Sequence, residues 1–238
     1  MSEKKPLNIG LVGYGFMGRT HSNGYKRVND FFPDVEYRPV LKAICARNEE
    51  RANEFASQWG FESVETDWQA LIARDDIDII DVCTPGSSHE EIAVAALNAG
   101  KHVICEKPLA NTVAEAERMA AAAQASSGKS MVAFNYRRVP ALAYARELVR
   151  QGRLGRIFHV RAVYLQDWIS HPEFPLVWRL VKEEAGSGAL GDLGAHIVDA
   201  AQFVTGSQIT NVSGELRTFI DERPLVGETH HLEATKSA

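Results

Sequence analysis

LNIGLVGYGFMG, residues 7–18, is an apolar run followed at once by three glycines in the spacing G-x-G-x-x-G. The apolar run predicts a buried strand and the residues after it predict a helix, so the glycines lie where a strand turns into a helix. At such a turn Gly13 permits the tight bend, Gly15 lets the backbone approach a pyrophosphate, and Gly18 lets the helix pack close to the strand. The helix N-terminus would offer unpaired N–H groups to the phosphates. The alternative is a glycine-rich turn without a ligand, and the strand–turn–helix context favours a dinucleotide site.

Short apolar runs alternate with helical patterns through the first half of the chain, as in a parallel sheet covered by helices. The alanine-rich run at 114–125 is a strong helix former, and Ser87–Glu90 and Thr112–Glu115 match the capping box that starts a helix. The sequence therefore predicts an α/β fold, with a Rossmann-type doubly wound parallel sheet over residues 1–134. The predicted strands lie at 7–12, 40–45, 77–83, 102–105 and 131–134.

The second half, residues 135–238, has a different pattern and predicts an incomplete α+β domain for substrate binding and oligomerisation. Residues 169–188 are rich in Pro, Gly and Trp and predict a long loop. Helices are expected at 141–149 and 190–204, and strands at 157–168 and 209–220.

The composition excludes several classes of protein. Apolar residues make up 45% and charged residues 24%, which excludes a disordered or fibrous chain. The 26 Lys+Arg against 31 Asp+Glu give a net charge of −5, without the basic excess that nucleic-acid binding usually leaves. No apolar run approaches the roughly 20 residues of a membrane helix, and the first residues lack the pattern of a signal peptide. The three cysteines form no CxxC pair, so a reducing, cytoplasmic location is expected.

The end of the predicted strand at 40–45 bears on the choice between NAD and NADP. In NAD-binding domains an Asp or Glu there accepts hydrogen bonds from the ribose hydroxyls. This chain has Ala46 instead, followed by Arg47, whose guanidinium could bind a 2′-phosphate through a charge-assisted pair. The alternative is a solvated Arg47 near the start of a helix. We therefore expect NAD or NADP, with a slight preference for NADP.

Two predicted strands end in short motifs, Thr84-Pro85 and Glu106-Lys107-Pro108. The carboxyl ends of strands in a doubly wound sheet border the crevice that binds ligands, so Lys107 is expected near a nicotinamide. Pro108 restricts the backbone of the residue before it. A lysine beside apolar strand ends and a cationic ring should lose part of its preference for the charged form, which suits it to handle a hydroxyl proton. The alternative is an ordinary surface lysine.

The predicted helix at 190–204 carries Asp192, His196 and Asp199 at i, i+4 and i+7, a polar stripe beside an apolar one. Such a stripe is expected to face a cleft or water, and a solvated helix face is the alternative to a site. A metal pair finds no third ligand at a diagnostic spacing, so no metal is expected.

The ordered combination of these motifs resembles the glucose–fructose oxidoreductase, inositol dehydrogenase and MocA family, over residues 7 to about 220. Members oxidise one secondary hydroxyl of a sugar or cyclitol and pass the hydride to C4 of a nicotinamide. The resemblance thus implies an NAD(P)-dependent dehydrogenase that acts on a sugar, anhydrosugar or cyclitol. The segments that look most similar to the inositol-type and levoglucosan dehydrogenase branch are 134–140, 164–168 and 185–192.

The resemblance also implies roles for single residues. In the family the lysine of E-K-P and the Asp and His of the later helix line the active site, and these roles fall here on Lys107, Asp192 and His196. An unperturbed histidine titrates near neutral pH, so His196 is the first choice of base, and Lys107 would hold the substrate oxygen. Asp192 would fix the substrate or orient His196, and the base and anchor roles could be exchanged. The other candidates are, for the cofactor, Gly13, Gly15, Phe16, Met17, Gly18, Arg47, Thr84, Pro85, His89 and Glu106, and, for the sugar, Tyr136, Arg137, Gln166 and Trp168.

The chain departs from the family's pattern in its length. Family members have a second domain built around a large open sheet, of which only two strands are expected here. The final residues, 232–238, resemble a piece that normally lies further on, so an internal deletion and a C-terminal truncation are expected. The missing strands would leave apolar faces and sheet edges uncovered.

Two other interpretations stay open beside the dehydrogenase. One is a non-catalytic nicotinamide-binding remnant or regulator, and the other is an NAD-assisted glycosidase on the same fold. The expected partners are a small sugar or polyol and, if the second domain is intact, further copies of the chain. Neither a nucleic acid nor a membrane is expected as a partner.

Overall fold

A computed structural model describes residues 4–225 of the protein. The chain divides into two compact units, with the division between Ala133 and Phe134, and each unit is described by itself. The prediction made for residues 232–238 lies outside the described residues.

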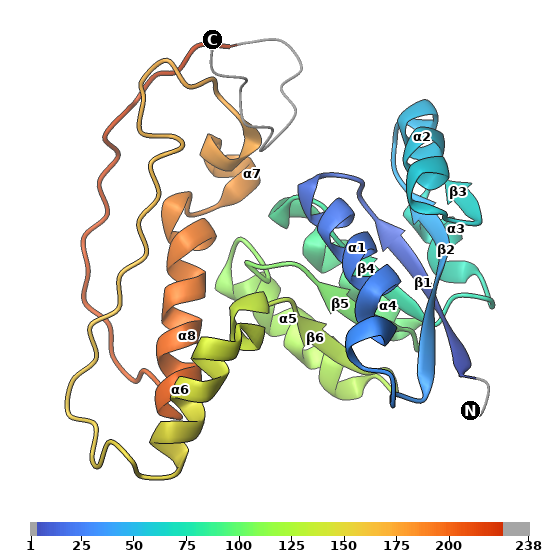
Figure 1. Ribbon diagram of the computed structural model, residues 1–238. Helices are drawn as coiled ribbons and strands as arrows, with labels where there is room; N and C mark the ends of the chain where they lie inside the picture. The colour runs from blue at the N-terminus through green and yellow to red at the C-terminus, as the bar shows by residue number, and fades with distance from the viewer. Residues whose placement is uncertain (1–3, 226–238) are drawn as a thin grey trace. The chain divides into compact units, whose positions relative to one another are not determined.

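The first unit is built on a six-stranded sheet in the order β3-β2-β1-β4-β5-β6, in which all neighbouring strands are parallel (Figure 1). The strand order reverses between β1 and β4, and the ligand crevice of such sheets lies at this point, outside the carboxyl ends of the strands. The prediction of a doubly wound parallel sheet is confirmed. The strands are β1 Lys5–Val12, β2 Tyr37–Cys45, β3 Ser63–Glu65, β4 Ile79–Val82, β5 His102–Cys105 and β6 Ser130–Val132.

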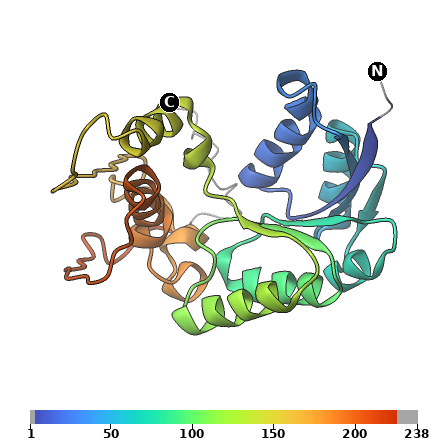
Figure 2. The same ribbon diagram turned by 90° about the horizontal axis from the view of Figure 1, so that it is seen from below.

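Helices cover both faces of this sheet. Figure 2 shows α1 and α2 on one side of the strands, and α4 and α5 on the other. One buried apolar cluster joins Ile44 of the sheet to Phe55 of α2, and a second joins Val103 to Ile92 of α4. The helices are α1 Phe16–Phe31, α2 Glu49–Trp59, α3 Trp68–Ala73, α4 His89–Asn98 and α5 Val113–Ala125, with a 3-10 turn, η1, at Gly86–Ser88.

The two predicted capping boxes have different outcomes. At α5 the Thr112 side chain accepts from the N–H of Glu115 and the Glu115 carboxylate accepts from the N–H of Thr112, so this box is confirmed. The box predicted at Ser87–Glu90 is wrong. The chain there makes η1 first, so the N-cap of α4 is Ser88 and not Ser87. The Ser88 hydroxyl bonds back to Thr84 Oγ1 at 2.7 Å and to the Pro85 carbonyl at 2.9 Å instead of capping α4.

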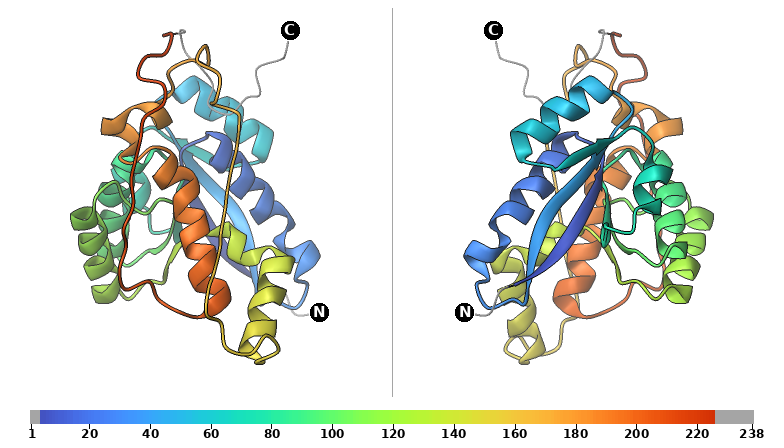
Figure 3. Two further views of the ribbon diagram at one scale, coloured as in Figure 1. Left: turned by 90° about the vertical axis from the view of Figure 1, so that its left-hand side faces the viewer. Right: turned by 90° about the vertical axis from the view of Figure 1, so that its right-hand side faces the viewer.

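All regular elements in the described part of the second unit are helical, and long irregular segments join them. Helix α6, Pro140–Arg150, packs against α8, Ala195–Thr205 (Figures 1 and 3). These confirm the helices predicted at 141–149 and 190–204, except that the first turn of the latter is a π-helix, η4, at Leu190–Gly194. The short elements are the 3-10 turns η2 Asn135–Arg138 and η3 Trp178–Leu180, and the helix α7 Lys182–Ala185.

The strands predicted at 157–168 and 209–220 are wrong for this structure. Both segments are irregular, and Figures 1 and 3 draw them without arrows. Alternating side chains mark a strand's two faces, but a strand also needs a neighbour for its backbone N–H and C=O groups, and no described strand pairs with either segment. Apolar side chains such as Phe158 and Phe219 are therefore left exposed.

Candidate active site

The glycine turn between β1 and α1 has the geometry that a pyrophosphate needs. Gly13 has φ +101°, and a Cβ on it would lie 2.9 Å from the Cys83 carbonyl oxygen. A Cβ on Gly18 would lie 2.2 Å from the Gly13 carbonyl oxygen, so only glycine allows this close packing. Gly15 is the N-cap of α1 without a side chain to bond the first N–H groups, and a Cβ there would meet no described atom within 4 Å. The turn therefore leaves open space in front of the helix N-terminus, which fits a phosphate.

The end of β2 carries the residues predicted to select the cofactor. Ala46 is half-buried, and its N–H donates to the Glu65 carbonyl at 3.1 Å. Arg47 is exposed, next to Asn48, whose side chain caps α2 by accepting from Arg51 N–H. Neither residue supplies the carboxylate expected for ribose hydroxyls.

The ends of β4 and β5 are joined by a buried histidine. His89 Nε2 lies 2.8 Å from the Thr84 carbonyl oxygen, and its Nδ1 lies 3.0 Å from that of Pro108. The Lys107–Pro108 peptide bond is cis, and Lys107 is half-buried. His89, predicted as a cofactor residue, thus holds together the two loops that carry Thr84 and Lys107.

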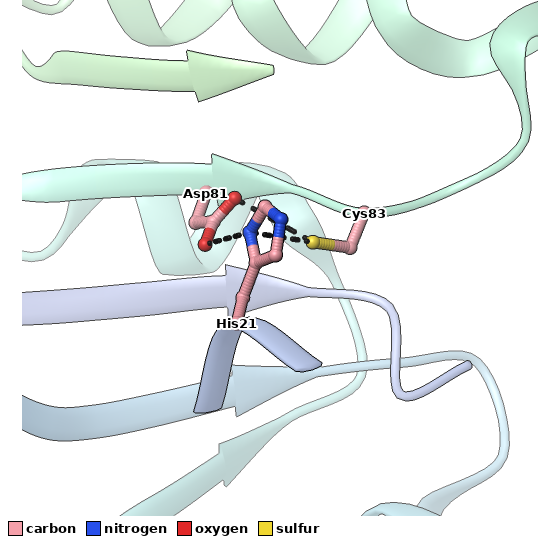
Figure 4. Close-up of side chains that lie close together, drawn as sticks. All are labelled: His21, Asp81 and Cys83. Atoms are coloured by element: carbon pink, nitrogen blue, oxygen red, sulfur yellow. Dashed lines mark hydrogen bonds and ion pairs between the residues drawn. The ribbon is translucent and has the colours of Figure 1, made fainter. Parts of the chain in front are cut away.

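A second histidine, which sequence reasoning missed, lies at the same edge of the sheet (Figure 4). His21 extends from α1 and donates from Nδ1 to Asp81 Oδ2 at 2.8 Å and from Nε2 to Glu106 Oε1 at 3.1 Å. The Tyr25 hydroxyl donates to the same Asp81 oxygen at 2.8 Å, and Cys83 Sγ lies 3.5 Å from Asp81 Oδ1. Asp81 is fully buried and Glu106 nearly so. We call these five residues the His21 network.

The charges in the His21 network follow from its geometry. Burial lowers the pKa of His21, but the hydrogen bonds to Asp81 and Glu106 outweigh it and raise the pKa to about 10. Burial and the Asp81 carboxylate raise the pKa of Tyr25, and burial raises that of Cys83, so both stay protonated as donors. The network is therefore an imidazolium held between two carboxylates.

His21, Asp81 and Cys83 also offer donor atoms within 4.8 Å of one another, the composition of a metal site. Two ligands of a tetrahedral zinc ion at about 2.0 Å lie about 3.3 Å apart, whereas His21 Nδ1 and Asp81 Oδ2 are only 2.8 Å apart. The cluster fits a hydrogen-bonded ion network better than a metal centre.

One member of the His21 network, Asp81, could have been predicted from the sequence. Asp81 lies inside the apolar strand segment Ile79–Val82, and a buried carboxylate needs a partner. Nothing local marked His21 as that partner.

In the second unit, aromatic and amide groups form a connected chain that ends at His196. The buried His196 ring stacks on Tyr136, with centroids 4.2 Å apart and an interplanar angle of 17°. The hydroxyls of Tyr136 and Tyr164 lie 2.5 Å apart, Gln166 Nε2 donates to Tyr164 at 2.8 Å, and Trp168 Nε1 donates to Gln166 at 3.0 Å. Burial and the neighbouring Tyr136 raise the pKa of Tyr164 to about 12. Three of the four predicted sugar residues thus belong to one hydrogen-bonded chain.

The polar stripe on η4 and α8 is not the solvated helix face that was the alternative to a site. His196 and Asp199 are buried instead of facing water. Arg137, the fourth predicted sugar residue, makes a two-pronged ion pair with Asp199 through Nε and Nη2, and its side chain is half exposed. Asp192 is half-buried, with Arg179 Nε 4.0 Å from its carboxylate.

The predicted catalytic residues are divided between the units. Lys107 belongs to the first unit, and Asp192 and His196 belong to the second, so each half is described within its own unit. Among the cofactor candidates, Phe16 is exposed and Met17 half-buried beside the glycine turn, and Glu106 is a member of the His21 network.

Comparison with known proteins agrees with this architecture. The model of the oxidoreductase family with an NAD-binding Rossmann fold, the glucose–fructose oxidoreductase, inositol dehydrogenase and MocA family, matches residues 7–134. The family's C-terminal domain matches residues 142–235. The chain belongs to this family. The predicted family and its dinucleotide-binding fold are thereby confirmed.

Individual relatives are similar over nearly the whole chain. Levoglucosan dehydrogenase of Pseudarthrobacter phenanthrenivorans is 47% identical over 219 residues, 92% of this chain and 56% of that protein. An oxidoreductase domain protein from Kribbella flavida has a TM-score of 0.91 and 57% identity, covering 93% of this chain and 60% of its own. A levoglucosan dehydrogenase complex with NADH and levoglucosan has a TM-score of 0.91 and 47% identity over the same shares. The chain thus spans less than two thirds of these relatives' lengths. Among its described residues, no helix has the length and apolar character needed to cross a bilayer.

Proposed function

We propose that this chain acts as an NAD-dependent dehydrogenase that oxidises a secondary hydroxyl of an anhydrosugar such as levoglucosan, or of a related sugar or cyclitol. The observation that carries the proposal is the open glycine turn at Gly15, with Lys107 at the end of β5 in the same sheet. The similarity to a levoglucosan dehydrogenase solved with NADH and levoglucosan supports the cofactor and the substrate class. NAD replaces the slight preference for NADP that Ala46 and Arg47 suggested.

The bound dinucleotide supplies the hydride acceptor. The carbon that bears the hydroxyl gives up its hydride only as the hydroxyl oxygen loses its proton. A base must therefore lie within hydrogen-bond reach of that oxygen. We assign that base to His196, whose ring plane is fixed by stacking on Tyr136. Lys107 holds the same oxygen and stabilises its developing negative charge, and Asp192 fixes the substrate or orients the base.

We propose that four hydrogen-bonded side chains of the second unit recognise the sugar, namely Tyr136, Tyr164, Gln166 and Trp168. Its hydroxyl and amide groups can both donate and accept hydrogen bonds, and the indole offers a flat apolar face to the C–H groups of a ring. Gln166 is exposed and Trp168 half-buried, so both have surface to offer a ligand.

The test is turnover by the purified chain. NAD is mixed with a panel of anhydrosugars, pyranoses and cyclitols, and the absorbance of reduced nicotinamide is followed. Lys107→Met and His196→Asn are each expected to lower kcat by about 10²–10⁴-fold while NADH binding stays. A folded protein that neither binds NADH nor oxidises any compound of the panel would refute the proposal.

One observation favours a second candidate, a nicotinamide-binding protein without turnover. The segments 157–168 and 209–220 are irregular and expose large apolar side chains, including Phe158, Leu165 and Phe219. This candidate predicts NADH binding without turnover, and no further loss in Lys107→Met.

The location and assembly of the chain are also proposals. Cys45, Cys83 and Cys105 are free thiols, which suits the reducing cytoplasm. The exposed apolar side chains of the second unit favour a homo-oligomer that covers them, which light scattering on the purified chain would test.

A further inference from the structure

The geometry points to a positioning role for His21: through the Glu106 carboxylate, it fixes the backbone of Lys107 at the edge of the sheet. The inference rests on the proposed function, in which Lys107 holds the substrate oxygen. It concerns residues of the first unit only, and His21 acts on Lys107 through Glu106.

The link from His21 to Lys107 runs through both oxygens of one carboxylate. Glu106 Oε1 accepts from His21 Nε2 at 3.1 Å, and Glu106 Oε2 accepts from the backbone N–H of Lys107 at 3.0 Å. Glu106 is only 4% exposed, so water is a poor substitute for either partner. A shift of the His21 ring therefore displaces the Glu106 carboxylate and, with it, the backbone of Lys107.

The other side of His21 is anchored to the neighbouring strand. Its Nδ1 donates to Asp81, which is fully buried in β4 and also accepts from Tyr25. β4 and β5 are paired through Val82 and Cys105, directly before Cys83 and Glu106. The Cys83 carbonyl oxygen is the atom that would lie nearest to a Cβ on Gly13, at 2.9 Å. The network thus joins α1, β4 and β5 immediately behind the glycine turn.

The charge of His21 makes this link strong. The groups that face it are Tyr25 from α1, Asp81 and Cys83 from the end of β4, and Glu106 from the end of β5. The carboxylates outweigh burial and hold the pKa of His21 at about 10, so the ring stays charged at neutral pH. Removing the ring leaves two buried carboxylates without their shared cation, a strongly unfavourable arrangement.

The first test does not depend on turnover. Amide hydrogen exchange at Lys107 is measured in the wild-type chain and in His21→Asn, and the variant is expected to exchange at least about tenfold faster. The matched control is His102→Asn at the opposite end of β5, where His102 Nδ1 accepts from the N–H of Lys129 at 2.8 Å. In this control the exchange of Lys107 is expected to stay unchanged.

The second test separates positioning from general damage. Because misplacing a reacting group by about 1 Å can cost roughly 10²-fold, His21→Asn is expected to lower kcat about 10- to 100-fold. KM and NADH affinity should change less than about threefold. Glu106→Gln keeps the ring but removes one of the two carboxylates that raise its pKa. Without the Glu106 carboxylate, the pKa of His21 should fall below about 10. The kcat of the variant is therefore expected to decrease with rising pH at a pH below 10, where the kcat of the wild type does not.

The outcomes separate this inference from the proposed function. Unchanged Lys107 exchange in folded His21→Asn would overturn the positioning role, whether or not the wild type turns over. If His21→Asn does not fold, Glu106→Ala decides by the same exchange measurement, because it removes both acceptor oxygens that join His21 to the Lys107 N–H. Faster Lys107 exchange in a chain that oxidises no substrate, even at a high concentration of sugar, would support the positioning of Lys107 and refute the dehydrogenase.

Discussion

Replacing Gly15 by serine should change stability and cofactor affinity in opposite directions. Gly15 is the N-cap of α1, with φ −63° and ψ −166°, a conformation open to any residue, and a Cβ there meets no described atom within 4 Å. Serine is a better N-cap than glycine by a few tenths of a kcal/mol, because its hydroxyl accepts from an early N–H of the helix. The free energy of unfolding of the cofactor-free chain should therefore stay the same or rise slightly.

The same hydroxyl competes with a phosphate for the early N–H groups and occupies the space of its approach. Hydrogen bonds to a charged group contribute about 1.5–3 kcal/mol each, and about 1.4 kcal/mol is a tenfold change in affinity. The loss of one such bond should weaken NADH binding about 10- to 150-fold. Urea unfolding of the free chain and calorimetric titration with NADH measure the two effects separately.

The matched control is Gly24→Ala on the same helix. Gly24 lies in the interior of α1, and a Cβ there also meets no described atom within 4 Å. Alanine should stabilise the helix by about 0.5–1 kcal/mol and leave NADH affinity unchanged. If Gly15→Ser binds NADH as tightly as Gly24→Ala does, the glycine turn is not the pyrophosphate site and the reasoning fails.

Three further predictions test other parts of the structure. The folded pKa of His21, about 10, lies above its ordinary 6.5, so its stabilisation is complete below pH 6.5 and is lost as pH rises toward 10. At about 1.4 kcal/mol per pH unit the loss is at most about 5 kcal/mol, and urea unfolding from pH 6 to 10 should show it in the wild type but not in His21→Asn. Arg47→Ala should leave the NADH dissociation constant within about twofold, since Arg47 is exposed just after β2. Wild-type binding of NADPH that is tighter than that of NADH, and that Arg47→Ala abolishes, would favour NADP instead, because only NADPH carries the 2′-phosphate. Arg137→Ala should destabilise the fold by about 1–3 kcal/mol and Asp199→Ala by less, because Asp199 is buried whereas Arg137 is half exposed and can be hydrated. Equal losses on urea unfolding would contradict this.

The first unit could be predicted from sequence because its signals are local. An apolar run, a glycine turn and an alanine-rich helix each specify their element without reference to distant residues, and β1, α1 and α5 agree with their predictions. The capping box at Ser87 is wrong for a local reason too, since the turn η1 includes Ser87 and the N-cap of α4 is Ser88.

The remaining features of the fold and of the site depend on contacts between residues far apart in the sequence, which no local pattern predicts. The alternation at 157–168 predicts two faces but cannot supply the neighbouring strand that would satisfy the backbone. No local pattern pairs Arg137 with Asp199, which lies 62 residues away in the sequence. His21 is 60 residues from Asp81 and 85 from Glu106, so only the folded sheet shows that a histidine on α1 bridges two strand ends.

The two halves of the proposed site are held by contacts of unequal strength. Lys107 is fixed by buried charges and by the bonds of His89, all within a unit that has its own apolar core. His196 is fixed by Tyr136, whose hydroxyl partner Tyr164 lies in an irregular, mostly exposed segment. Segments with few buried contacts open at low free-energy cost, so conditions that loosen Tyr164 should abolish turnover while NADH binding persists. Binding without turnover therefore does not by itself favour a non-catalytic protein. Only a chain that stays inactive when this segment is ordered, for example by a high concentration of sugar, would do so.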